Sequence, residues 1–136
     1  MKTHHLFISH SWAYSDAYER LVGLLDRRTY FRFKDYSVPR DDPIHNARSI
    51  AALRTAIRQR MAPCGVVLIL AGVYATYSKW IDEEIALAQK GFRSPKPIIA
   101  IRPRGNRRLS KPVSQAADRV VRWNKDSIVS AIREVA

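Results

Sequence analysis

The stretch 65–71 (GVVLILA) has no polar side chain at any position, and it limits the possible folds more than any other feature of the sequence. A strand with one side in water alternates apolar and polar residues, so an uninterrupted apolar run indicates a strand that is covered on both faces. Strands of this kind belong to parallel sheets, in which a helix connects one strand to the next. The stretch therefore predicts an α/β fold.

The rest of the chain alternates short apolar runs with amphipathic stretches, as an α/β fold requires. Besides 65–71, we predict strands at 5–9, 30–34, 97–101 and 119–123, and helices at 16–27, 50–61, 79–90 and 125–135, with a short helical turn at 113–117. Right-handed crossovers favour a flavodoxin-like, open five-stranded parallel sheet of order 2-1-3-4-5, with helices on both faces. The more solvated strands, 30–34 and 119–123, are expected at the sheet edges.

Length and composition indicate the number of domains and the expected cellular location. The 136 residues fit one domain, 1–136. Cys64 is the only cysteine, so no disulfide forms within the chain, and a reducing, cytoplasmic location is expected. The longest apolar run, 66–71, is far shorter than the about 18 residues that a membrane-spanning helix needs. The first five residues show no signal-peptide pattern, so we expect neither secretion nor a membrane partner.

The formal net charge of +12 is concentrated in one segment, the basic block 93–125. This block holds ten Lys or Arg residues and a single acid, Asp118. Such a segment is either a solvated face or the contact surface for an anionic partner or ligand. No RNA-binding aromatic motif accompanies the block, and Trp123 is the only aromatic residue in its charged part, so nucleic acid is a disfavoured partner.

The predicted sheet also predicts where a ligand binds. In open parallel sheets, ligands bind beyond the carboxyl ends of the strands, where the strand order reverses. Here that crevice lies between the first and third strands and is bordered by residues 9–15 and 72–84. The loop 35–46, with two prolines and four Asp or Asn residues, lies nearby, and loops of this length often carry function.

Several common site chemistries have no counterpart in the sequence. The five glycines lie far apart, so there is neither a P-loop nor a GxGxxG turn. The third strand ends in Ala71-Gly72 and not in the aspartate of a phospho-receiver domain. The histidines and the cysteine lack zinc-ligand spacing, and no GxSxG motif marks a hydrolase nucleophile. We therefore expect neither a metal nor a bound cofactor.

The most informative segment is 77–84 (YSKWIDEE), which opens the helix after the central strand. Trp80 and Glu84 are four residues apart, so they lie one turn apart on the same helix face. One interpretation is that the carboxylates at 82–84 form a solvated acidic first turn, which the helix dipole favours. The other is that Glu84 is a functional carboxylate beside an aromatic wall, because this helix begins at the predicted crevice.

Three segments resemble the TIR family: FISHS at the end of the first strand, the long proline-containing loop after the second, and SKWIDEE. The segments HLFISHSW, DYSVPRDDPIH and ILAGVYATYSKWIDEEI are most similar in sequence to prokaryotic TIR-like proteins of Thoeris antiphage-defence systems. The W-x-x-x-E spacing matches the motif that carries the catalytic glutamate of TIR NADases, which maps onto Glu84. The loop sequence DYSVPRDDPIH departs from the usual TIR loop, so its contacts do not carry over.

The resemblance implies that NAD is a substrate whose nicotinamide–ribose bond is cleaved. The Thoeris relatives convert the ADP-ribosyl group into a cyclic or conjugated second messenger, which reaches a downstream effector by diffusion. Cleavage builds positive charge on the ribose, which a positioned carboxylate such as Glu84 can stabilise. The expected substrate contacts are Ser9, His10, Ser11, Trp12, Tyr36, Asp42, His45, Tyr77 and Trp80.

Two other functions remain open. The first is a catalytically silent TIR scaffold that signals by homotypic association, which implies a homo-oligomer. The second is a nucleic-acid-binding module that uses the basic block 93–125. The carboxylate at Glu84 favours the enzyme over the scaffold.

Overall fold

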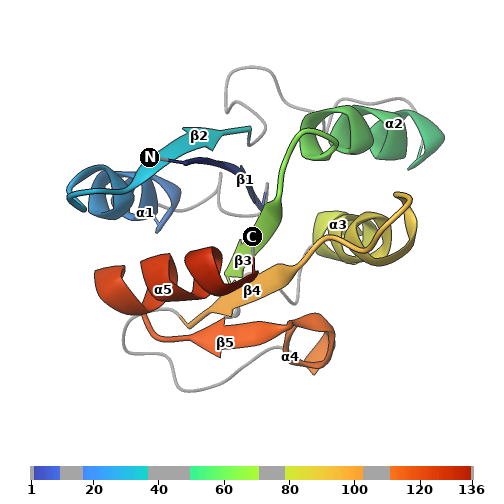
Figure 1. The fold of residues 1–136 in the computed structure, drawn as a ribbon. Helices are drawn as coiled ribbons and strands as arrows, with labels where there is room; N and C mark the ends of the chain where they lie inside the picture. Colours follow the sequence, from blue (N-terminus) through green and yellow to red (C-terminus); the bar gives the residue numbers. More distant parts are fainter. Residues whose placement is uncertain (1, 10–16, 37–49, 71–78, 103–110, 136) are drawn as a thin grey trace.

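The structure is a computed structural model that describes residues 2–9, 17–36, 50–70, 79–102 and 111–135. Its five strands are β1 (Thr3–Ile8), β2 (Arg32–Asp35), β3 (Val66–Leu70), β4 (Ile98–Ile101) and β5 (Arg119–Val121). Its five helices are α1 (Ala17–Asp26), α2 (Ile50–Met61), α3 (Lys79–Lys90), α4 (Lys111–Ala116) and α5 (Lys125–Val135). Strands and helices alternate along the chain (Figure 1).

The strands form one parallel sheet of order β2-β1-β3-β4-β5, which confirms the predicted order. Leu6 pairs with Val66 across β1 and β3, and Val67 pairs with Ile98 across β3 and β4. The strands β2 and β5 are the edges, as their more polar sequences predict. The strand order reverses between β1 and β3, so this is where the candidate site is expected.

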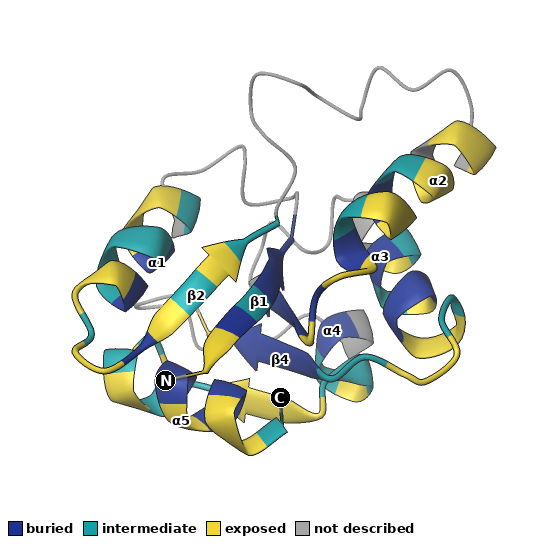
Figure 2. Cartoon of the chain, turned by 45° about the horizontal axis from the view of Figure 1, so that its top comes forward, coloured by how far each residue is buried: buried dark blue, intermediate teal, exposed yellow. Residues whose placement is uncertain are grey.

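Two apolar layers cover the sheet, one on each face. On one face, residues of α1 and α5 such as Leu21, Leu25 and Ile128 pack against alternate residues of β1, β3 and β4. On the other face, residues of α2, α3 and α4 such as Ile57 and Leu87 pack against the remaining strand residues. The helices lie on the two sides of the sheet in Figure 1, and exposed residues gather on their outer surfaces in Figure 2.

Some element bounds differ from the sequence prediction. The strand β2 begins at Arg32 and not at residue 30, because Tyr30 has a φ of 58° and cannot continue an extended strand. The helix α4 begins two residues before the predicted turn, and its first turn accommodates a proline because the N–H groups there have no helical partner. The bounds of α3 and α5 match the prediction. None of the helices within the described ranges has the length and apolar character needed to cross a membrane.

Candidate functional site

The carboxyl ends of β1 and β3 are joined directly at the point where the strand order reverses. Ser9 follows the last residue of β1 and is buried, with 1% of its surface exposed. Its N–H group donates a hydrogen bond to the carbonyl oxygen of Leu68 in β3 at 2.9 Å, so the ladder continues past the end of the strand. Ser9, predicted to contact substrate, is therefore held at the end of the central strand pair.

The three carboxylates at the start of α3 have three different environments. Asp82 is exposed, Glu83 is partly buried, and Glu84 is fully buried, with 0% of its surface exposed. Successive residues lie 100° apart around a helix, and the buried residues Leu87 and Ala88 place Glu84 on the face that packs against the sheet. The interpretation of 82–84 as a solvated acidic turn is therefore wrong for Glu84, although it describes Asp82.

Packing alone does not explain the choice of glutamate at position 84. Removing an ionised carboxylate from water costs several kcal/mol even after the surrounding protein relaxes. An aliphatic residue, as at Leu87 one turn later, fills a position against the sheet without that cost. A buried carboxylate in the second turn of a helix that follows the strand at the reversal of strand order is the pattern expected of a functional group.

Two arginines of α2 hold both ends of α3. Near its start, Nε and Nη2 of Arg54 lie 2.5 Å and 3.2 Å from the two carboxylate oxygens of Glu83, in a bidentate geometry. This hydrogen bond, together with the attraction of the charge, raises the pKa of Arg54. One turn further along α2, Nε of Arg58 donates to the carbonyl oxygen of Gly91, directly after α3, at 3.1 Å. Arg54 and Arg58 together fix the position of the helix that carries Glu84.

Tyr36, another predicted substrate contact, follows the last residue of β2. Its N–H group donates to the carbonyl oxygen of Leu6 at 2.9 Å, and its hydroxyl lies 2.8 Å from Nδ1 of His5. The side chain packs against the apolar layer that also includes residues of α3. On the opposite face of the sheet, the hydroxyl of Tyr18 in α1 donates to a carboxylate oxygen of Asp35. Tyr36 thus lies on the same face of the sheet as Glu84.

Among the predicted site residues, Ser9 lies at the carboxyl end of β1 and Tyr36 at that of β2. Glu84 lies in α3, the helix that follows β3. Trp80 lies in α3, of which the structure describes the backbone at that position. The other predicted contacts lie outside the described residues: His10, Ser11, Trp12, Asp42, His45 and Tyr77. Sequence reasoning missed Arg54 and its pairing with Glu83; the available signal was the spacing of Arg54 and Arg58 on the polar side of α2.

An open depression of about 320 Å³ lies at the opposite end of the sheet, lined by Pro95, Lys96, Pro97, Asp118, Arg119 and Val135. Its charged residues have structural partners. Nζ of Lys96 donates to the carbonyl oxygen of Cys64 at 2.7 Å, and a carboxylate oxygen of Asp118 accepts from the N–H group of Ile98 at 2.8 Å. The depression is therefore distinct from the candidate site at the carboxyl ends.

Comparison with known protein families identifies one match. The family model of the TIR-like domain of the Thoeris protein ThsB matches residues 7–108. The matched span begins in β1, passes the end of α3 and includes Ser9, Tyr36 and Glu84. The search among curated proteins found no match.

Proposed function

The chain belongs to the TIR-like domain family of the Thoeris antiphage-defence protein ThsB, and on that premise we propose that it cleaves the nicotinamide–ribose bond of NAD. The observation that carries this proposal is the complete burial of Glu84 on the helix that follows the central strand. Trp80, four residues earlier on the same helix, completes the W-x-x-x-E spacing.

Glu84 is proposed as the catalytic carboxylate. When the bond between the ribose C1′ and the pyridinium nitrogen breaks, its electron pair goes to nicotinamide, which leaves as a neutral molecule and needs no general acid. The positive charge that develops on the ribose is stabilised by a carboxylate, and burial strengthens this interaction because little water screens it. Water or a second nucleophile then attacks C1′, which gives ADP-ribose or a cyclic or conjugated derivative. We propose such a derivative as the diffusible signal to a downstream effector.

The substrate is proposed to lie between the end of β1 and the start of α3. Ser9 is the described polar residue at the end of β1, and Tyr36 lies beyond β2 on the face that α3 covers. The proposed contacts from outside the described residues are His10, Ser11, Trp12, Asp42, His45 and Tyr77, with Trp80 from α3. The role of the Arg54–Glu83 pair is to hold the first turns of α3 in place.

The test compares Glu84→Gln with Asp82→Asn, which removes an exposed carboxylate from the same helical turn. Glu84→Gln should lower NAD turnover at least about 100-fold, because an interaction with charge developing in the transition state is lost. Asp82→Asn should leave turnover unchanged. Turnover is measured by chromatography of NAD and nicotinamide, with mass analysis of the products, both with and without extract of phage-infected cells.

Thermal unfolding of Glu84→Gln provides the folding control. The variant should stay folded, because glutamine keeps the shape of glutamate and removes only the charge. Near-normal NAD turnover by a folded Glu84→Gln protein would contradict the proposed mechanism.

A further inference from the structure

Tyr30, in the turn between α1 and β2, has two properties that side-chain packing does not explain. Its φ of 58° lies in the left-handed region, which glycine and asparagine adopt readily and bulky residues rarely do. The residue is 79% exposed, so the ring contributes little to any apolar core. Residues that break local structural rules without a packing gain are expected at functional positions.

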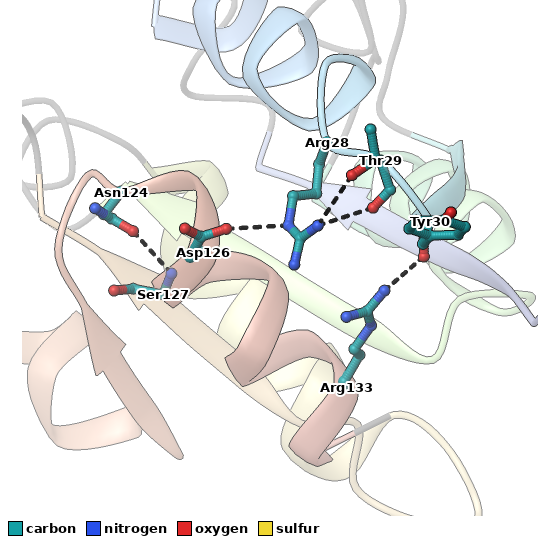
Figure 3. Close-up of polar contacts among 7 residues, drawn as sticks. All are labelled: Arg28, Thr29, Tyr30, Asn124, Asp126, Ser127 and Arg133. Carbon is teal, nitrogen blue, oxygen red and sulfur yellow. Dashed lines mark hydrogen bonds and ion pairs between the residues drawn. The ribbon is translucent and has the colours of Figure 1, made fainter.

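Two arginines hold this turn in place (Figure 3). Arg133, from α5, donates from Nη2 to the carbonyl oxygen of Tyr30 at 2.5 Å. Arg28 donates from Nη1 to the carbonyl oxygen of Thr29 at 2.9 Å, and its Nε lies 3.0 Å from a carboxylate oxygen of Asp126. The exposed ring is therefore presented on a braced backbone.

Two cations lie near the residue that follows Tyr30. Arg133 also lies over the ring of Phe31, which stacks on His4 with ring centroids 5.3 Å apart. The pKa of His4 is lowered by its burial and then by the charges of Lys2 and Arg133, so both cations lie close to this stack.

Two more arginines extend the charge on either side of Tyr30. Arg27 and Arg32 are exposed, and neither forms an ion pair with a carboxylate of the described residues. Asp126 in α5 neutralises Arg28, and Asp26, the last residue of α1, is the acid next to Arg27. We call the set Lys2, Arg27, Tyr30, Arg32 and Arg133 the Tyr30 surface; it has four positive charges.

We propose that the Tyr30 surface binds single-stranded nucleic acid, with an unpaired base stacked on the Tyr30 ring and the neighbouring phosphates on the arginines. Single-strand binding combines an exposed aromatic ring with nearby cations, and the Tyr30 turn has both. A duplex would supply charge but no free base face for the ring. The surface lies at the amino ends of the strands, away from Glu84 on the carboxyl side, so this binding does not depend on NAD turnover.

The sequence alone gave no sign of this surface. The basic block 93–125 lacks a suitable aromatic residue, and Tyr30 is 103 residues from the arginine that braces it. The fold brings the ring and the charges together.

The first test is fluorescence anisotropy with a labelled single-stranded oligonucleotide of about 12 nucleotides, the length that one small binding surface covers. Tyr30→Asn removes the ring but suits the left-handed backbone, so the turn and the melting temperature should be retained. It should weaken binding by about 5- to 150-fold, the range measured for loss of a base–aromatic stack. Tyr30→Phe keeps the ring and should bind like the wild type.

The second test separates a local contact from general attraction to a basic protein. The double variant R27S/R32S should lower the slope of log affinity against log salt concentration by about 1.4, because two phosphate contacts are lost. The matched control, K90S/R93S, removes two exposed charges at the end of α3 and should change neither affinity nor slope.

Three results would overturn the proposal. The first is unchanged single-strand affinity in a folded Tyr30→Asn protein. The second is an equal loss of salt dependence in R27S/R32S and K90S/R93S. The third is a preference of the wild type for duplex of the same length or for phosphatidylserine vesicles, which would assign the surface to another class of partner.

Discussion

Replacing Gly91 by alanine tests how closely the residue after α3 approaches the last turn of that helix. A Cβ atom at Gly91 would lie 2.8 Å from both Cδ2 and the carbonyl oxygen of Leu87, and 3.0 Å from its Cα. The side-chain atom can move, but the two backbone atoms belong to the turn that the 2.8 Å hydrogen bond from Gly91 to Leu87 closes. Overpacking of this kind costs about 1–3 kcal/mol, so the melting temperature should fall by about 3–12 °C.

Two other glycines provide matched controls with the opposite sign. A Cβ atom at Gly23 or Gly65 would meet nothing within 4 Å. Gly23 lies inside α1, where alanine should stabilise the protein by about 0.5–1 kcal/mol because it loses less conformational freedom in a helix. Gly65 directly precedes β3, and alanine there should add about 0.4–1 kcal/mol by restricting the unfolded chain.

The assay is thermal and urea unfolding of the three single variants, followed by far-ultraviolet circular dichroism. The order of melting temperatures should be Gly91→Ala, then wild type, then Gly23→Ala and Gly65→Ala. A Gly91→Ala protein that melts at or above the wild-type temperature would refute the steric argument. Loss of stability in all three variants would show that open space at a glycine does not determine the sign.

Reversing either charge of the Arg54–Glu83 pair should lower NAD turnover, because the first turns of α3 lose their attachment to α2. The double variant R54E/E83R should recover turnover. A double variant as inactive as the single variants would contradict this role. Burial raises the pKa of the Cys64 thiol to about 12, so at about pH 8 only about one thiol in 10⁴ is ionised, and rapid alkylation of native protein by iodoacetamide would contradict this. Because the thiol of the unfolded chain ionises near pH 9, the free energy of unfolding should fall between about pH 9 and pH 12, and less steeply in Cys64→Ala. Burial lowers the pKa of His4, so the unfolded chain takes up a proton first and the free energy of unfolding should decline as the pH falls below about 6.5. Urea unfolding measured at about pH 5 and about pH 7.5 should show a smaller difference in this free energy for His4→Phe than for the wild type. An equal difference in the two proteins would assign the decline to other groups.

Helix positions and strand order could be predicted because they depend on local patterns and chirality. The apolar spacing of α3 and α5 marks the inner face of each helix, and the glycine after α3 marks where that helix ends. The order of the strands follows from right-handed crossovers of ordinary length, which leave few alternatives for five strands.

Features that depend on contacts between distant residues could not be predicted. The late start of β2 results from the left-handed backbone of Tyr30. Glycine or asparagine at that position would have indicated such a backbone, but the residue is a tyrosine. The attachment of Glu83 to Arg54 joins residues 29 positions apart. In the candidate site, the helical face of Glu84 follows from its spacing to Leu87 and Ala88, but its full burial depends on how α3 packs against the sheet. Its catalytic role stays a prediction.

The pairing of β1 with β3 has a consequence for synthesis of the chain. Leu6 pairs with Val66, so β1 cannot pair with β3 until about 60 further residues have been synthesised. At a synthesis rate of about 5–20 residues per second, this takes about 3–12 s. The edge strand β2 emerges earlier and pairs with β1 on its other side, from Thr3 beside Arg32. For those seconds the nascent chain exposes an apolar, unpaired sheet edge that favours aggregation. Substitutions in β1 therefore act on the yield of folded protein as well as on its equilibrium stability.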